Sequence, residues 1–590
     1  MSRIVRDAGR TEYRGDAYRV TLLDGNAGVV RVTDHDGGPI ADLLLMSSAH
    51  PAGRTDAVTS LSHVEALATA DGHLCLHQRA QSTVWQSKHA ELRCQPDRIE
   101  YRFAVNGGGA IDTVAYFERG AHEPRYSDRH TLSGFHRPPR ARDGWRGSTG
   151  YFQNVVSPAP NGACRSLFGR SDTATNHPGN DAGFWGGDWF FTPAPYAYGL
   201  VGRGSVMIAG LAPSLDELDF YRFDYRGGAE WGLALTYDGA ITARGDWQAP
   251  TVLLLPAADA DRGLRAYAAS IQSAGLLPPK PSGGPDWWTE PNWCGWGEQV
   301  AQEGELRAFQ LSSAANYREW LSRLDAHGVV PGTVVVDDRW QSALGEGTPS
   351  AAWADLGVFI AERHQRGQRV LLWHNVWEIE RPSPGERTIE RGGEPLRGAF
   401  GHLLADPTSD WFHRRITDVM RRMLAPPPVG LGADGLKLDI THSTPTADGL
   451  WTEGTVRGNA LLRALLLQTY QAAKAANPDA VVESHAANPY FRDTFDVLRL
   501  NDIFTDLASV VDEMTRRTAT ARAMGFDLID CDGWSMPSKA ALLEYVEAQE
   551  TLGTPSLYYA TRVDSTREPI EPDDLRRVAA SWSRYRRVRG

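Results

Sequence analysis

The sequence has 590 residues and a mass of 64.8 kDa, with 42% hydrophobic and 23% charged residues. This composition is typical of folded globular proteins and argues against extensive disorder or a fibrous architecture. Its 61 basic and 73 acidic residues give a net charge of -12, and no basic cluster accompanies a nucleic-acid-binding motif, so we expect no nucleic acid partner. The first residues lack the apolar core of a signal peptide, and no run of about 18 apolar residues occurs. We therefore expect a cytoplasmic protein that does not insert into a membrane.

Residues 15–275 alternate polar and apolar positions in short segments such as YRVTLL and RIEYRFAV, separated by DG, NG and GG turns. This pattern predicts an N-terminal antiparallel β-sandwich domain over residues 1–278. Within it, residues 181–200 are too rich in Gly, Pro and aromatic residues for a regular strand. We expect a shaped loop there, and its residues Trp185 and Trp189 are candidates for covering the mouth of the second domain.

After the Pro- and Gly-rich residues 277–288 the rhythm changes to short apolar runs that alternate with amphipathic stretches. The eight runs lie at 292–297, 333–338, 369–377, 434–440, 480–485, 496–502, 527–533 and 556–560. Helices are predicted at 311–327, 351–366, 409–424, 457–476, 507–523, 538–551 and 571–587, whereas residues 486–495 leave room for only a very short one. Eight such units predict a (β/α)8 barrel over residues 279–590.

Polar residues follow six of these apolar runs at their C-terminal ends, where barrels of this kind carry their active sites. They are Asp337 and Asp338, His374, Asp439 with His442 beyond it, Glu483 and His485, Asn501 and Asp502, and Asp530 and Asp532. A helix N-cap or a solvated loop explains any single pair, but polar residues at the ends of six predicted strands favour one shared site. Carboxylates accept hydroxyl protons and indole rings pack on sugar C–H faces, so the expected substrate is a carbohydrate.

Hydrolysis of a glycosidic bond with retention of configuration needs two carboxyl groups, one as nucleophile and one as acid and base. Asp439 and Asp502 end the predicted strands four and six, although spacing alone does not select them over Asp338 or Glu483. Lys437 lies two residues before Asp439, on the same face of an apolar strand. A buried lysine is costly, so it forms either a structural ion pair or a cation that keeps Asp439 ionised and contacts a sugar hydroxyl.

These motifs resemble the α-galactosidase clan of glycoside hydrolases, above all family 36 and more distantly the family 31 α-glucosidases and α-xylosidases. The matching motifs are NW at 292–293, DDRW at 337–340 where the family has DDGW, KLD at 437–439 where it has KWD, ES at 483–484, and ND at 501–502 where it has SDN. Trp373 within LLWHNVWE also matches. The resemblance covers the barrel, and family members likewise place a β-sandwich before it.

The resemblance implies a retaining exo-α-glycosidase without a metal or cofactor, with Asp439 as nucleophile and Asp502 as acid and base. Asp337, Asp338 and Lys437 would hold the terminal sugar, and a homo-oligomer is a family expectation. The full set of candidate substrate-binding residues is Asp337, Asp338, Trp340, Trp373, His374, Lys437, Glu483, His485, Arg499, Trp293 and Trp185. For Arg499, contact with an anionic group and a surface ion pair both stay open.

Two departures from the family pattern concern the glycone pocket. Arg339 replaces the glycine of DDGW, and residues 484–493 (SHAANPYFRD) replace a glycine-rich stretch, so the sequence does not identify the sugar as galactose. Within the same clan of enzymes, α-glucosidase or α-xylosidase activity and transglycosylation remain alternatives. Two alternatives lie outside the clan: a metal-dependent hydrolase that uses His374, His442 and His485, and a sugar-binding protein without catalysis.

Overall fold

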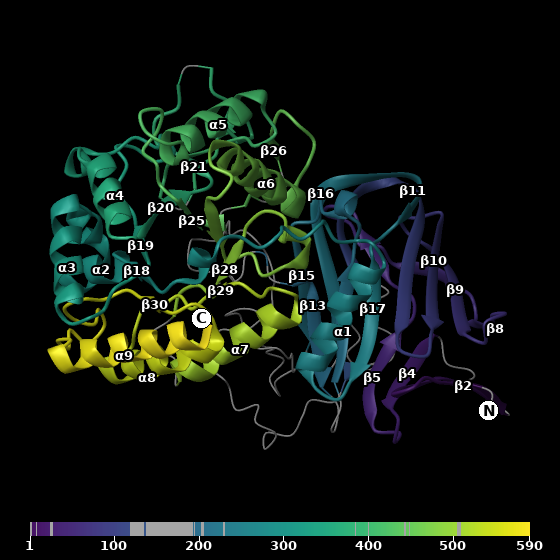
Figure 1. The fold of residues 1–590 in the computed structure, drawn as a ribbon. Helices are drawn as coiled ribbons and strands as arrows, with labels where there is room; N and C mark the ends of the chain where they lie inside the picture. Colours follow the sequence, from purple (N-terminus) through teal and green to yellow (C-terminus); the bar gives the residue numbers. More distant parts are fainter. Residues whose placement is uncertain are drawn as a thin grey trace.

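The computed structural model describes residues 3–7, 9–23, 28–117, 135–136, 193, 195–201, 206–227, 231–383, 385–398, 400–441, 444–445, 447, 449–503 and 509–589. Antiparallel sheets form the N-terminal part, and a parallel barrel surrounded by helices forms the C-terminal part (Figure 1). The predicted fold, a β-sandwich followed by a (β/α)8 barrel, is confirmed. Trp185, Trp189 and His442 lie outside the described residues.

The N-terminal part consists of two sheets that share one core. The Tyr18 hydroxyl, on β3, donates a hydrogen bond of 2.9 Å to the carbonyl of Arg98 and so joins the sheets. Along β10 buried and less buried residues alternate, as expected for a strand with one face on a core. The first sheet has the order β1 (Ile4–Asp7), β2 (Arg10–Arg14), β3 (Tyr18–Leu23), β4 (Val29–Asp34), β5 (Pro39–Leu44), β12 (Phe135–His136).

The second sheet is larger and ends against a helix. Its main path runs β13 (Ala197–Val201), β14 (Val206–Ala212), β17 (Thr251–Ala257), β11 (Ile99–Tyr116), β10 (Ser87–Cys94), β9 (Leu74–Ser82), β7 (Val58–Leu61). Off this path lie β6 (Ser48–His50), β8 (Glu65–Ala68), β15 (Arg222–Gly227) and β16 (Trp231–Gln248). The β prediction up to residue 275 is wrong at its end, where α1 (Ala260–Ser273) buries Leu264, Tyr267 and Ile271. Their spacing of three and four residues is the helical period that the β assignment overlooked.

The barrel strands coincide with the eight predicted apolar runs. Among the described residues they follow in the order β18 (Asn292–Cys294), β19 (Thr333–Val336), β20 (Arg369–Asn375), β25 (Gly435–Asp439), β27 (Val481–Ser484), β28 (Val497–Arg499), β29 (Ile529–Asp530), β30 (Ser556–Leu557). The paired strands of this sheet, in the part of the chain that the structure describes, are all parallel, β30 pairs with β18, and an isolated parallel bridge joins Asp530 to Thr554. The ring of strands is therefore nearly closed, and their C-terminal ends share one mouth.

The helices around the barrel also match the prediction. They are α3 (Ala314–Ala326), α4 (Leu356–Gln365), α5 (Asp410–Leu424), α6 (Gly458–Ala476), α7 (Val510–Ala523), α8 (Lys539–Leu552) and α9 (Pro572–Arg589). Between β27 and β28 the chain, described throughout, forms only the short 3₁₀ helix Pro489–Phe491, as residues 486–495 predicted. The sequence missed α2 (Trp296–Glu303), the 3₁₀ helix Glu305–Leu311 and the small strands β21 (Glu378–Ile379), β22 (Glu390–Arg391), β23 (Glu394–Pro395), β24 (Leu403–Leu404) and β26 (Leu450–Trp451).

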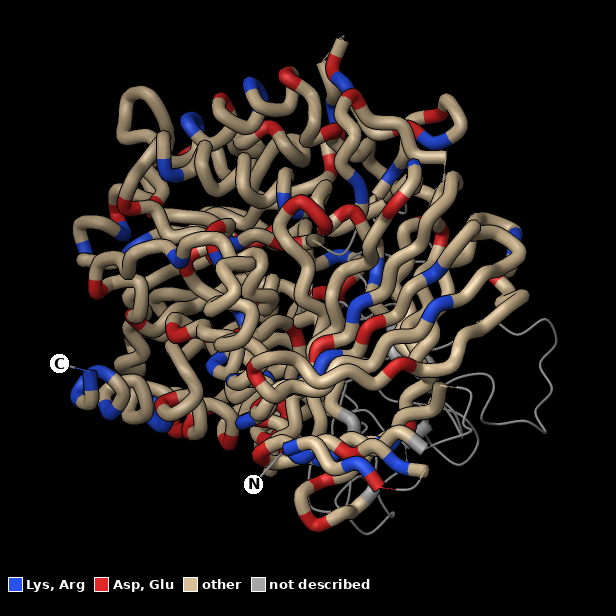
Figure 2. The backbone as a smooth tube through the Cα atoms, turned by 90° about the vertical axis from the view of Figure 1, so that its right-hand side faces the viewer, with Lys and Arg blue, Asp and Glu red and all other residues tan. Residues whose placement is uncertain are grey.

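The two parts of the chain contact each other at the N-terminus of α6. The backbone N–H groups of Asn459 and Ala460 donate to the carbonyls of Phe220 and Leu218, at 3.0 and 2.9 Å. The predicted boundary between residues 278 and 279 stays a prediction. No helix in the described part of the chain is long and apolar enough to cross a membrane, and acidic and basic residues are interspersed along the chain (Figure 2).

Candidate active site

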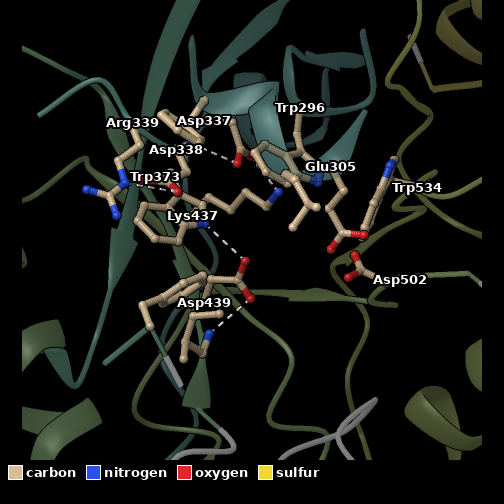
Figure 3. A pocket seen from close by; sticks show the side chains of 14 residues that line it. Trp296, Glu305, Asp337, Asp338, Arg339, Trp373, Lys437, Asp439, Asp502 and Trp534 are labelled. Atoms are coloured by element: carbon tan, nitrogen blue, oxygen red, sulfur yellow. Dashed lines mark hydrogen bonds and ion pairs between the residues drawn. The ribbon is translucent and has the colours of Figure 1, made fainter. Parts of the chain in front are cut away.

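A pocket of about 440 Å³ opens at the C-terminal ends of the barrel strands (Figure 3). Of the predicted residues, Asp337, Asp338, Trp373, Lys437, Asp439 and Asp502 line it. The other residues on its wall are Trp296, Glu305, Leu306, Phe309, Arg339, Phe400, Ile440 and Trp534. Charged groups therefore share the pocket with a large aromatic and aliphatic surface.

Lys437 on β25 forms a buried ion pair inside this pocket. Its Nζ lies 2.7 Å from Asp337 Oδ2, which also accepts a hydrogen bond of 3.0 Å from the Cys294 thiol. Burial lowers the pKa of Lys437, but Asp337, Cys294 and Asp532 together outweigh burial and the net shift is upward. The Nζ also lies 5.2 Å from the centre of the Tyr558 ring, an arrangement that favours the charged form. Lys437 is thus a fixed cation at the base of the pocket.

Asp439, the last residue of β25, is held by several donors at once. Trp373 Nε1 donates to its Oδ2 at 3.0 Å, the N–H of Ile440 donates to its Oδ1 at 3.0 Å, and Arg499 Nη1 lies 3.9 Å from Oδ1. Burial raises the pKa of Asp439, but the opposing effects of Arg499, Lys437 and His485 together are larger and bring it down to about 2. This carboxyl is an anion at neutral pH.

The backbone turns sharply directly after this carboxylate. Ile440 has a φ of 63°, which is unusual for a β-branched residue. Residues in such conformations persist where the surrounding structure fixes them, and they cluster at active sites. Here the turn directs the N–H of Ile440 at Asp439, and the strained conformation serves to hold the carboxylate.

Asp502, three residues after β28 ends, has the opposite electrostatic setting. Burial together with the charges of Asp532 and Asp439 raises its pKa well above the ordinary value, and Arg499 and Lys437 only partly offset this shift. Asn501 before it has a φ of 62°, a conformation that asparagine tolerates better than most residues. Of these two pocket aspartates, Asp439 is therefore held as the anion, whereas the setting of Asp502 favours its protonated form.

Asp338 and Arg339 form another part of the pocket wall. Arg339 Nε lies 3.8 Å from Asp338 Oδ2, and Arg339 Nη1 lies 3.4 Å from Glu380 Oε2. Burial raises the pKa of Asp338 to about 7, and the nearby Arg339 reduces the shift. The side chain that replaces the family glycine is thus tied to two carboxyl groups beside the pocket.

A cluster of buried charges lies behind the pocket, inside the barrel. Arg499 Nη2 donates to Asp532 Oδ2 at 2.6 Å, and Asn292 donates to Asp530 at 2.9 Å. Burial, followed by the charge of Asp532, raises the pKa of Asp530 to about 7. Burial and then Asp530 likewise raise the pKa of Glu483. Arg499 is thus the cation that links this cluster to Asp439.

Six predicted substrate-binding residues are buried and are not among the residues that line the pocket: Trp293, Trp340, His374, Glu483, His485 and Arg499. Strand alternation explains Trp293, because Asn292 and Cys294 point into the barrel and direct Trp293 outward. There the Trp293 ring packs against the ring of Tyr317, on α3, with the ring centres 5.3 Å apart. Arg499 faces the barrel interior with Asp532, so the surface ion pair considered for it is wrong.

The remaining buried residues support the wall from behind. Trp340 donates to the carbonyl of Trp373 at 2.9 Å, and His485 Nε2 lies 2.6 Å from Thr441 Oγ1, two residues after Asp439. Burial, followed by the charge of Arg415, lowers the pKa of His374 to about 4. In the described residues no three His, Cys, Asp or Glu side chains are grouped as a metal ion would require.

Sequence reasoning missed the pocket residues that come from loops. Glu305, Leu306 and Phe309 belong to the 3₁₀ helix after α2, and Trp534 lies beyond β29. Trp296 and Trp534 pack edge to face with their ring centres 5.9 Å apart. Their one signal in the sequence is that they follow barrel strands one and seven, a position from which polar residues, but not these aromatic ones, were predicted to line the site.

No protein-family model matches the sequence, and no curated protein matches it. Solved structures do match. The α-N-acetylgalactosaminidase of Bifidobacterium bifidum, solved with GalNAc, aligns with a TM-score of 0.61 over 98% of this chain and 93% of its own, at 12% identity. An α-galactosidase from Thermus thermophilus, solved with p-nitrophenyl α-D-galactopyranoside, aligns with a TM-score of 0.50 over 89% of this chain and 95% of its own, at 16% identity.

An uncharacterized protein from Listeria monocytogenes aligns over 99% of this chain with a TM-score of 0.50 and 12% identity. The chain spans 54% of the length of that neighbour. The chain folds as the α-galactosidase type of glycoside hydrolase does. The resemblance drawn from the barrel motifs is confirmed at the level of the fold, whereas identities this low leave the reaction to be argued from the site.

Proposed function

We propose that the protein is a retaining exo-α-glycosidase that hydrolyses a terminal α-linked sugar through a glycosyl-aspartate intermediate. One observation carries the proposal: two aspartates face the same pocket, and the pKa of Asp439 is lowered to about 2 while that of Asp502 is raised. Retaining hydrolysis needs this combination of an ionised nucleophile and a protonated acid. The shared fold with α-galactosidase-type enzymes supports the same reaction class.

In the first step Asp439 attacks the anomeric carbon while Asp502 transfers its proton to the glycosidic oxygen, so the bond between that carbon and that oxygen breaks. The sugar is then bound to Asp439, and the former aglycone leaves as an alcohol. In the second step Asp502, now a carboxylate, takes a proton from water as the water attacks the anomeric carbon. The bond to Asp439 breaks, and the sugar leaves with its α configuration retained.

The base of the pocket is suited to a polyhydroxylated ring. Asp337 and Lys437 offer an acceptor and a donor that are fixed by their 2.7 Å ion pair. Asp338 Oδ1, which no hydrogen bond from the described residues engages, is a further acceptor. Trp373 lies beside Asp439 and offers its indole to the sugar face. The GalNAc and the galactoside bound in two of the similar structures make N-acetylgalactosamine and galactose the first candidates for the glycone, and the wall at Arg339 is where a different sugar would be selected.

The test is hydrolysis of aryl α-glycosides (galactoside, N-acetylgalactosaminide, glucoside, xyloside and L-arabinopyranoside) by wild type, Asp439→Ala and Asp502→Ala, with and without a chelator. Asp527→Ala serves as a matched control, because this barrel aspartate is 77% exposed and paired with Lys280. We expect one glycoside to be hydrolysed irrespective of chelator. Asp439→Ala should abolish its turnover, Asp502→Ala should slow it by about 100- to 10,000-fold, and Asp527→Ala should leave it unchanged.

Mass spectrometry of the wild type after reaction with a 2-fluoro glycosyl fluoride of the same sugar tests the intermediate directly. We expect a covalent adduct on the peptide that contains Asp439. Turnover that survives Asp439→Ala, or an adduct on another residue, would contradict the assignment. Binding of the sugar without turnover of any glycoside would favour the sugar-binding alternative, and turnover lost with the chelator would favour the metal-dependent one.

A further inference from the structure

The two proposed catalytic aspartates, Asp439 and Asp502, are held in place in different ways. The carboxylate of Asp439 accepts hydrogen bonds from Trp373 and from the N–H of Ile440. The carboxyl of Asp502 is engaged by no side-chain hydrogen bond from the residues that the structure describes, and its contacts there are made by its backbone. The direction of the Asp502 side chain therefore depends on how the backbone of residues 500–503 is fixed.

Arg517 fixes this backbone from α7. Its Nη1 donates to three consecutive carbonyls, those of Leu500, Asn501 and Asp502, at 2.8, 2.9 and 2.8 Å. Its Nε is bonded to Glu513 Oε1 at 3.0 Å, one helical turn earlier. Both side chains are fully buried, so the ion pair keeps the guanidinium in place without competition from water.

Three consecutive carbonyls reach one donor only where the chain curls around that donor. The left-handed conformation of Asn501, with a φ of 62°, provides this curl. On the other side of Asp502, the backbone of Ile503 pairs with the segment after β29, where the N–H of Ser535 donates to the Ile503 carbonyl at 2.8 Å. Asp502 thus lies where the two anchors meet, since Arg517 bonds its own carbonyl and the next residue is held by Ser535, and its carboxyl points into the pocket (Figure 3).

We infer that Arg517 is a positioning residue for the general acid: it holds the turn at residues 500–502 so that the Asp502 carboxyl meets the glycosidic oxygen. This inference rests on the proposed function. A general acid must lie within hydrogen-bond reach of the atom that it protonates, and a displacement of about 1 Å caused by a remote substitution can cost about 100-fold in rate. Arg517 does this without touching the substrate.

Leaving groups of different acidity separate this role from a purely structural one. A 2,4-dinitrophenolate departs without protonation, whereas a phenolate needs the general acid. We would measure kcat/KM for the 2,4-dinitrophenyl and phenyl α-glycosides of the sugar identified above, with wild type, Asp502→Ala, Arg517→Met and Arg517→Lys. Arg522→Met is the matched control, because Arg522 lies on the same helix and donates to two backbone carbonyls, Thr551 and Leu552, both at 3.0 Å.

For Arg517→Met we expect kcat/KM to fall by about 100-fold with the phenyl glycoside and to change little with the dinitrophenyl glycoside. Arg517→Lys, which keeps the charge beside Glu513, should fall between Arg517→Met and wild type. Asp502→Ala should show the same dependence in stronger form, and Arg522→Met should show none. Thermal unfolding of each variant identifies those that fold, and Arg517→Lys decides the question if Arg517→Met does not.

Each contrary result has a distinct meaning. Equal losses with both glycosides in a folded Arg517 variant, alongside a clear leaving-group dependence in Asp502→Ala, would overturn the positioning role and leave the proposed function intact. If Asp502→Ala itself shows no leaving-group dependence, Asp502 is not the acid, and the proposed function and the inference fail together.

Discussion

Asp439 and Asp502 differ in proton affinity because their neighbours carry different charges. Arg499, Lys437 and the Trp373 N–H surround Asp439, whereas Asp502 experiences the negative charges of Asp532 and Asp439. The two shifts are coupled, since the charge on Asp439 is one reason why Asp502 keeps its proton. In the proposed mechanism, binding of the sugar to Asp439 removes that charge, so the pKa of Asp502 would fall. The acid of the proposed first step would thereby become the base of the second.

These pKa shifts predict the pH dependence of kcat/KM. The proposed mechanism requires a free enzyme with Asp439 ionised and Asp502 protonated, so kcat/KM should fall as rising pH removes the proton from Asp502. On the acid side it stays level down to about pH 3, because the pKa of Asp439 is lowered to about 2. The measurement is a pH profile with the phenyl glycoside, over the range where the protein stays folded.

A control and a contrary outcome complete this test. Because the pKa of Asp338 is raised to about 7, Asp338→Asn shows which part of the alkaline limb belongs to that residue. The limb that remains should vanish with the dinitrophenyl glycoside. An acid limb near 3.8, the ordinary aspartate pKa, would mean that Arg499 and Lys437 do not act on Asp439 as described.

At the scale of elements, α6 begins on the backbone of the N-terminal part. The first N–H groups of a helix lack partners within it, and here the carbonyls of Phe220 and Leu218 accept two of them. Asp219 accepts a further hydrogen bond, of 2.8 Å, from the N–H of Arg457. In the chain, α6 is the helix that follows the barrel strand ending at Asp439, with β26 between them.

Gly458 makes this contact possible, and Gly458→Ala should destabilise the protein strongly. Its φ is 53°, and a Cβ would lie 2.2 Å from the Phe220 carbonyl oxygen. The matched control is Gly525→Ala, where φ is 89° and nothing lies within 4 Å of the added Cβ. The control should cost only the backbone penalty, about 1 kcal/mol. Thermal unfolding should show a clearly larger fall for Gly458→Ala, and equal falls would contradict the contact.

Most of these elements could be predicted from the sequence, because buried parallel strands form continuous apolar runs and the intervening helices are amphipathic. The alternation of strand residues also placed Lys437 and Asp439 on one face. The alternation of strand residues does not show how deep a side chain lies along the barrel axis. For this reason the sequence places Glu483 and Arg499 in the pocket, although in the structure they lie behind it. Trp534 and the residues of the 3₁₀ helix Glu305–Leu311 reach the pocket from irregular loops, whose course no periodicity predicts.

At the scale of the whole molecule, the N-terminal sheets cover the place where the barrel lacks a full helix. Between β27 and β28 only the short 3₁₀ helix Pro489–Phe491 is present, and its Tyr490 and Phe491 are fully buried. Tyr196, just before β13, packs on Tyr490 with ring centres 5.7 Å apart and on Phe220 at 4.9 Å. Arg492 adds a hydrogen bond of 2.6 Å to the carbonyl of Pro278. Figure 1 shows this side of the barrel against the strands and α1.

This shared core predicts that the two parts of the chain unfold together. Scanning calorimetry of the wild type should show one transition, because exposing Tyr490 and Tyr196 would penalise either part if it unfolded alone. Tyr490→Ala removes a buried ring, at a cost of about 3 to 5 kcal/mol, and should weaken the coupling so that the transition moves down and broadens or divides. Tyr13→Ala, equally buried but in the first sheet, should lower a transition that stays single. Two resolved transitions in the wild type would show that the barrel is stable without its cover, and the contacts of Tyr490 would then serve only to orient the two parts.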